Sequence, residues 1–423
     1  FVEEIFLTNL FFANILFTLL IGLLIVHFFE LKKYILLTIT IVLTIIIDII
    51  FIFYLIRNKE LLVDYIDRYR EVFYSFLLLL LYFLIQSLFT NNPLVSLSHS
   101  FGMVRFIILL FAVLYVFNTK EKIINVILVS FIALFIVNID SLYQYIFKID
   151  IFGVEMYGNG RRINAWNEMP VVSLYSGEFF GILLSSVIIL KDNYRKVAIF
   201  SLLFFVVIFF LSGNRSPIVS LFSTIFIIGL FSSYKKYLFL FLLAISFVFS
   251  LTFFSDKLSN AYKDILSPSS NEAINGRTQI YVTSLEIIKE NPLFGIGSGM
   301  FRYDFQDYYS RIYDKNSEDK MTQYYFKEAP FHSHNILLDL LVSYGFVGFL
   351  IFIFLVYKIY LIFVKGKDIV LIASVGFVYC ITPLQFAKSL SQSNWQFYTF
   401  LGLIFMILIS VYLDIEKKEK NEI

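Results

Sequence analysis

Long, continuously apolar stretches alternate with short polar connections along most of the 423-residue chain. A helix needs about 20 apolar residues to cross the roughly 30 Å hydrocarbon layer of a membrane. Strands of a membrane barrel would alternate apolar and polar positions, and these stretches do not. The pattern therefore predicts an all-α, polytopic transmembrane bundle of about twelve spans, near residues 5–29, 34–56, 72–90, 101–117, 123–139, 171–190, 197–213, 216–232, 237–254, 335–357, 368–386 and 396–413.

Two longer polar segments interrupt this pattern, at residues 140–170 and 255–334. The second is long enough for a small helical unit outside the membrane, and its part rich in Tyr and charge, Phe301 to Phe331, favours helices at the membrane interface. The predicted organisation has spans one to nine in 1–254, a large loop in 255–334, and spans ten to twelve with a polar tail in 335–423.

The distribution of lysine and arginine predicts the orientation, because cytoplasmic loops are enriched in these residues. Among the short loops alone, with the long segment 255–334 left out, one alternate set carries 17 of them and the opposite set carries 7. Both termini are therefore expected in the cytoplasm, as an even number of spans requires, and residues 255–334 on the outer side of the membrane. ATP is absent there, so a group transfer at this face needs a donor that arrives already activated.

Composition excludes several classes of protein. With 59% hydrophobic and 16% charged residues, the chain is neither a soluble nor a disordered protein. A net charge of +2 gives no reason to expect nucleic-acid binding. The single cysteine, Cys380, excludes an internal disulfide framework. Four histidines and scattered acidic residues offer no obvious cluster for a metal ion, so neither a metal nor a cofactor is expected.

Three polar residues stand within or beside predicted spans. Arg105 lies near the outer end of the fourth span, where it either snorkels to the interface or faces a functional cavity. Glu178 lies about seven residues into the sixth span and is either functional or paired with an arginine. Gln144 is interpreted as an ordinary loop-end residue rather than a ligand.

Two arginines lie near glycines on the outer side, Arg215 in a tight turn and Arg277 at the opening of a helix-like run. Arg215 lies in Ser212-Gly213-Asn214-Arg215-Ser216, between two spans, and a guanidinium fixed there matches phosphate oxygens with two parallel hydrogen bonds. This favours a phosphate clamp over a solvated turn charge. Arg277 follows Gly276 before a helical run. The later Gly295–Gly299 segment lacks the lysine of a phosphate-binding loop, so it predicts a tight turn that returns the loop to the bundle.

Two histidines, His332 and His334, precede the tenth span in Phe331-His332-Ser333-His334-Asn335. A spacing of two does not place both on one face of a helix, so the two rings are expected to point in different directions and not to share a metal. A single histidine here could act as a general base near neutral pH. The alternative is a capping or interfacial histidine.

Three motifs follow one another along the chain: the Ser212–Ser216 turn, Gly276-Arg277 with Asn291-Pro292-Leu293-Phe294-Gly295, and His332–Asn335 leading to Gly345 and Gly348. In this order they resemble the O-antigen ligase and polymerase superfamily. The resemblance covers about residues 160–350 of a family of bacterial multi-pass glycosyltransferases. It implies a GT-C-like bundle in the bacterial inner membrane, among membrane lipids. It also implies a metal-independent transfer of a glycan from undecaprenyl diphosphate on the periplasmic side.

Residue roles follow from the resemblance by position. Arg215 and Arg277 would hold the donor diphosphate, and His334 would be the catalytic residue that activates or positions the acceptor. Arg161 and Arg162 match an arginine-containing segment of the family. The supporting candidates are Arg161, Arg162, Arg105, Glu178, His332 and Asn335.

The activity implied is that of an O-antigen ligase, which transfers the glycan to a hydroxyl of the lipid A-core oligosaccharide in lipopolysaccharide biosynthesis. A polymerase that joins lipid-linked repeat units shares this donor chemistry, as does a protein O-oligosaccharyltransferase, so the motifs do not separate the three. A flippase for lipid-linked oligosaccharides is the alternative from another class, but it should show repeat symmetry between halves, which we do not find in this sequence. The sequence leaves the sugars, the acceptor, the linkage stereochemistry and the oligomeric state open.

Overall fold

The computed structural model describes residues 67, 69–157, 162–164, 172–251, 272–383, 389 and 393–422. Within these ranges the regular elements are all helices. Only isolated bridges join Ile149 with Glu155 and Tyr157 with Arg162. The predicted all-α class is confirmed for this part of the chain. The first two predicted spans, 5–29 and 34–56, lie outside it.

Eight long helices follow the predicted apolar stretches. They are α4 (Arg70–Ser87), α5 (Pro93–Val116), α6 (Lys120–Phe147), α10 (Asp192–Leu211), α11 (Arg215–Phe231), α12 (Lys235–Leu251), α17 (Ile336–Ile359) and α20 (Ser393–Asn421). A π-helical turn, η3 (Tyr360–Val364), continues α17. Of the described helices, six are long and apolar enough to cross a membrane, namely α4, α5, α6, α10, α17 with η3, and α20. The count of twelve spans stays a prediction.

Two predicted spans are broken helices rather than continuous ones. The stretch 171–190 forms α8 (Val172–Ser176) and α9 (Phe179–Ile189), and the stretch 368–386 contains α18 (Asp368–Ala373) and α19 (Val375–Ile381). Both breaks lie where backbones touch: a Cβ on Gly181 would overlap the carbonyl of Ala373, and one on Gly376 would overlap the carbonyl of Glu178. Broken helices are tolerated at membrane depth because neighbouring protein groups bind the freed polar atoms.

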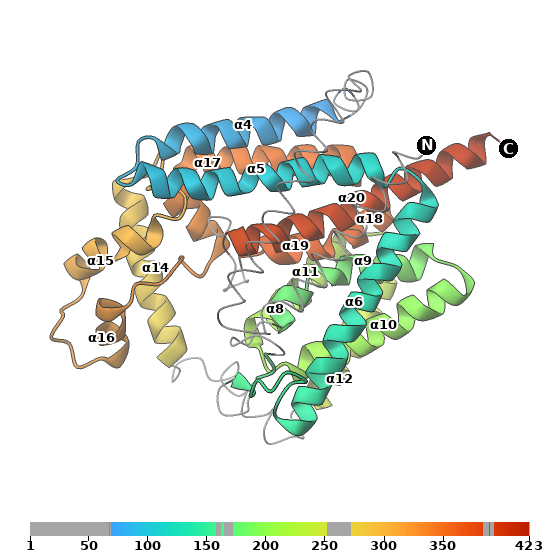
Figure 1. Cartoon of the computed structure of the whole chain (residues 1–423), viewed down its shortest axis with the longest axis horizontal. Helices are drawn as coiled ribbons and strands as arrows, with labels where there is room; N and C mark the ends of the chain where they lie inside the picture. Colours follow the sequence, from blue (N-terminus) through green and yellow to red (C-terminus); the bar gives the residue numbers. More distant parts are fainter. Residues whose placement is uncertain are drawn as a thin grey trace.

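The helices α4, α5 and α17 run side by side along one edge of the molecule, with α20 next to α5 (Figure 1). Their contact faces belong to one large apolar core that is rich in phenylalanine. The rings of Phe83 on α4 and Tyr344 on α17 stack with centroids 3.9 Å apart. Dispersion and aromatic contacts of this kind hold membrane helices together, since lipid gives no hydrophobic drive for their association.

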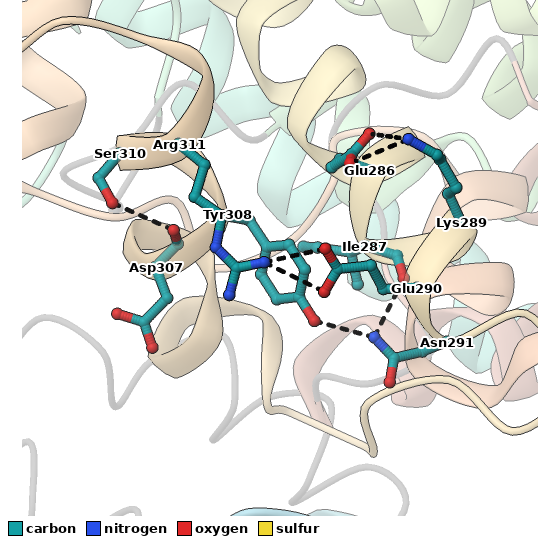
Figure 2. Close-up of polar contacts among 9 residues, drawn as sticks. All are labelled: Glu286, Ile287, Lys289, Glu290, Asn291, Asp307, Tyr308, Ser310 and Arg311. Carbon is teal, nitrogen blue, oxygen red and sulfur yellow. Dashed lines mark hydrogen bonds and ion pairs between the residues drawn. The ribbon is translucent and has the colours of Figure 1, made fainter.

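Three more polar helices gather at one end of this group (Figure 1). They are α14 (Glu272–Glu290), α15 (Phe301–Ile312) and α16 (Lys320–Lys327). They share a separate apolar cluster, which includes Ile280, Phe305 and Tyr325 together with Val342 of α17. Arg311 of α15 also pairs with Glu290 of α14 at 2.9 Å (Figure 2). This second core fixes α14 against the start of α17.

The glycine-rich segment after α14 fits into a kink of α17. Gly345 has φ 61° and ψ −169°, a conformation open essentially only to glycine. The backbone N–H groups of Ile296 and Gly297 donate to the carbonyls of Val342 and Ser343, each at 2.9 Å. A Cβ on Gly345 would overlap the carbonyl of Leu293. The predicted tight turn that returns the loop to the bundle is therefore confirmed.

Candidate active site

Arg215 is the first residue of α11, and the turn before it is held by two other segments. The side-chain amide of Asn214 donates to the hydroxyl of Ser173 on α8 at 3.0 Å. The backbone N–H of Ile163 donates to the carbonyl of Ser212 at 3.2 Å. Because these two bonds hold the turn before Arg215, the backbone from which its side chain extends is fixed.

Arg277 lies in the first half of α14, and Tyr281 follows one helical turn later on the same face. Burial lowers the pKa of the Arg277 guanidinium, while the tyrosine oxygen raises it and the positive charge of Arg215 lowers it further. The charge of Arg215 therefore acts on the pKa of Arg277, although the two residues lie 62 positions apart in sequence. Two like charges held together favour the binding of an anion between or beside them.

His334 has an unusual backbone conformation in the segment before α17. Its φ is +52°, in the left-handed region that residues with a Cβ rarely adopt. The backbone N–H of His334 donates to Nδ1 of His332 at 3.1 Å, and the two ring centroids lie 4.4 Å apart. The expectation that the two rings point in different directions is therefore wrong. The segment is a tight turn, so neither helical nor strand periodicity applies to it.

Tyr281 connects the two halves of the site. Its hydroxyl donates to the backbone carbonyl of His334 at 3.3 Å. Burial raises the pKa of this hydroxyl, so the proton needed for the donation is retained. This bond joins the His334 segment to α14, the helix that carries Arg277, two features that the sequence singles out separately. Sequence reasoning missed this tyrosine, although its position four residues after Arg277 is a signal for a shared helix face.

His332 is 5% exposed. Burial lowers the pKa of its imidazole well below the usual range, and the neighbouring His334 lowers it further. Since Nδ1 accepts a hydrogen bond, the single ring proton is assigned to Nε2. His332 is therefore a hydrogen-bond acceptor inside the segment, not a charge at the surface of the site.

Asn335 is the N-cap of α17. Its side-chain oxygen accepts from the backbone N–H groups of Leu337 at 3.0 Å and Leu338 at 3.2 Å. Its amide nitrogen donates to the carbonyl of Pro383, beyond the end of α19, at 3.1 Å. These bonds use both ends of the side chain, so Asn335 fixes the start of the helix that follows His334.

The segment around Arg162 is hydrogen-bonded to the end of α6. The backbones of Arg162 and Tyr157 exchange two hydrogen bonds of 3.1 Å. The side-chain amide of Gln144 donates to Asn164 Oδ1 at 2.9 Å and its oxygen accepts from the N–H of Asn164 at 3.0 Å. Both side chains are buried, so interpreting Gln144 as an ordinary loop-end residue is wrong. Arg161 lies outside the described residues.

The remaining supporting candidates lie within the helical bundle. Glu178 is fully buried at the break between α8 and α9, where the thiol of Cys380 donates to Oε1 at 3.3 Å. Arg105 lies near the middle of α5, because this helix begins at Pro93 rather than near residue 101. The expected position of Arg105 near the outer end of a span stays a prediction.

These observations define a multi-pass membrane protein in which α14, one of three polar helices at one end of the bundle, carries Arg277 and is bonded through Tyr281 to the backbone of His334. A family model described as O-antigen ligase matches residues 200–353. The match contains Arg215, Arg277 and His334, and it confirms the resemblance to the O-antigen ligase and polymerase superfamily. No curated protein matches the chain.

Proposed function

We propose that the protein is an O-antigen ligase. It transfers a glycan from undecaprenyl diphosphate to a hydroxyl of the lipid A-core oligosaccharide, at the periplasmic face of the bacterial inner membrane. One observation carries the proposal: Tyr281 lies beside Arg277, whose charge repels that of Arg215, and the Tyr281 hydroxyl binds the backbone of His334. The bond joins the backbone of His334 to the helix that carries Arg277, which supports a site where a base acts near a bound diphosphate.

The proposed step is a substitution at the anomeric carbon of the donor. The bond between this carbon and the diphosphate oxygen breaks, and a bond from the acceptor oxygen to the same carbon forms. The acceptor proton passes to the imidazole of His334, and undecaprenyl diphosphate leaves with an additional negative charge. Arg215 and Arg277 stabilise this charge as it develops, which lowers the barrier because the donors are already oriented.

The arginines supply the charge stabilisation, so we expect no divalent cation to take part. The same chemistry serves a polymerase, in which the acceptor hydroxyl belongs to another lipid-linked repeat unit. The orientation with both termini in the cytoplasm and residues 255–334 in the periplasm belongs to the proposal as well. It rests on the asymmetry of Lys and Arg between alternate loops.

The direct experiment uses the purified protein with a glycan linked to undecaprenyl diphosphate and a lipid A-core acceptor, in buffer containing EDTA. The expected result is release of undecaprenyl diphosphate together with glycosylated lipid A-core. Release that depends on added Mg²⁺ contradicts the metal-independent step. Consumption of the donor only when a second lipid-linked unit is present identifies a polymerase.

Deletion in the source bacterium separates the same two activities inside the cell. Loss of a ligase leaves bare core on the surface and accumulates long lipid-linked glycan. Loss of a polymerase leaves core that bears a single repeat unit. Loss of surface glycan, with the lipid-linked intermediate trapped on the cytoplasmic side, would instead favour a flippase.

A further inference from the structure

The backbone of His334 is held at both of its polar atoms by side chains. The N–H donates to Nδ1 of His332 at 3.1 Å, and the carbonyl accepts from the hydroxyl of Tyr281 at 3.3 Å. Between these two bonds the residue stays at a φ of +52°. A residue with a Cβ keeps such a conformation only where its surroundings impose it, and these conformations cluster at functional sites.

The two side chains come from different elements. Tyr281 extends from α14, the helix that carries Arg277, whereas His332 belongs to the turn itself. The Tyr281 bond therefore fixes the histidine segment to the arginine helix. The His332 bond fixes the shape of the turn. Together they determine where the imidazole of His334 lies relative to the guanidinium of Arg277.

We propose that His332 and Tyr281 are positioning residues, which hold the backbone of His334 so that its imidazole meets the acceptor hydroxyl beside the arginines. This inference rests on the proposed function of His334. It adds that the neighbouring histidine takes no proton from the acceptor and serves as a buried, neutral hydrogen-bond acceptor. It also adds Tyr281, whose hydroxyl contributes to the reaction only by holding the backbone of His334.

The chain offers matched substitutions for each bond. Tyr281→Phe removes one hydroxyl and nothing else. His332→Leu removes the acceptor at similar volume, whereas His332→Asn keeps an acceptor, since Oδ1 of asparagine is bonded to Cγ as Nδ1 of histidine is. Tyr308→Phe is the control, because its hydroxyl accepts from the Asn291 amide at 2.9 Å near the far end of α14 (Figure 2).

The assay is steady-state turnover of a glycan linked to undecaprenyl diphosphate by the purified full-length protein. Tyr281→Phe and His332→Leu should each lower kcat by about 10- to 100-fold, the scale of a misplaced catalytic group. The KM for the donor should stay near that of the wild type, because Arg215 and Arg277 are unchanged. His332→Asn should restore most of the lost kcat, and Tyr308→Phe should behave as the wild type.

A second measurement separates positioning from general stability. In a His334→Ala background there is no imidazole to position, so adding Tyr281→Phe should lower the residual rate no further. The same fold loss in both backgrounds, equal rates for His332→Asn and His332→Leu, or wild-type kcat for Tyr281→Phe and His332→Leu overturns the positioning proposal. Wild-type turnover of His334→Ala overturns the proposed role of His334, and the positioning proposal falls with it.

Discussion

Asn335 stands directly after His334, and its hydrogen bonds predict that replacing it harms folding more than chemistry. Asn335→Ala removes the acceptor for two backbone N–H groups of α17 and the donor to Pro383. Losing an N-cap costs about 1 kcal/mol. A further hydrogen bond contributes about 0.5–1.5 kcal/mol. The expected loss is therefore about 2 kcal/mol in the free energy of unfolding, or roughly a 30-fold change in the folded-to-unfolded ratio.

Two companion variants divide this loss between the cap and the contact with Pro383. Asn335→Asp keeps the capping oxygen and places a negative charge at the helix N-terminus, so only the amide donor is lost and the cost should be about half as large. Asn92→Ala removes the cap of α5, where one backbone N–H is bound at 3.4 Å, so it should cost less than Asn335→Ala.

The assay is the thermal unfolding midpoint of the detergent-purified protein, measured together with its transfer rate. Asn335→Ala should lower the midpoint by several degrees while the rate per folded molecule stays within about tenfold of the wild type. An unchanged midpoint together with a loss of turnover would refute this reasoning. It would mean that Asn335 contacts a substrate rather than capping α17.

Three further predictions concern the two arginines proposed to bind the diphosphate, the kink of α17 at Gly345 and the orientation of the chain in the membrane. Arg215→Ala and Arg277→Ala should each abolish transfer by the normally inserted protein, and lysine should restore little because a point charge does not reproduce the guanidinium fork; full activity of either alanine variant removes that residue from the site. Gly345→Ala should destabilise the protein by about 2 kcal/mol or more in thermal unfolding. The control Gly366→Ala should cost less, because φ is +76° there but a new Cβ meets nothing within 4 Å. Equal unfolding midpoints of the two variants would contradict the fit of the loop into the kink. A cysteine at Ser317, in a chain without the native cysteine, should react with an impermeant thiol reagent in intact spheroplasts, and labelling only after lysis would reverse the orientation.

The sequence predicts where helices occur because a membrane span requires a long run of apolar residues, and that requirement is local. It does not predict the breaks within α8–α9 and α18–α19. Those breaks depend on which backbones touch, and the partners of Gly181 and Gly376 lie about 200 residues away along the chain. The kink at Gly345 escapes prediction for the same reason, although its glycine is part of the motif that supports the resemblance.

For the candidate site, the residues with unusual chemistry are recognisable from the sequence, whereas the residues that hold them in position are not. Arg215, Arg277 and His334 stand out because they are charged or titratable residues within short motifs in the polar segments between apolar spans. Tyr281 is one of 28 tyrosines, and nothing in its local pattern marks the bond to the carbonyl of His334. The pairing of Gln144 with Asn164 escapes prediction because the two side chains meet across a loop, a relation that only the folded chain establishes.

The most direct test of the central claim compares the wild type with His334→Ala in the release of undecaprenyl diphosphate from a lipid-linked glycan. If His334 accepts the acceptor proton, turnover should fall by about 10²–10⁴-fold, the usual contribution of general acid–base catalysis. Binding of the donor should survive, because Arg215 and Arg277 remain in place. An unaltered rate of release by the folded His334→Ala protein would contradict the assignment of this histidine as the catalytic base.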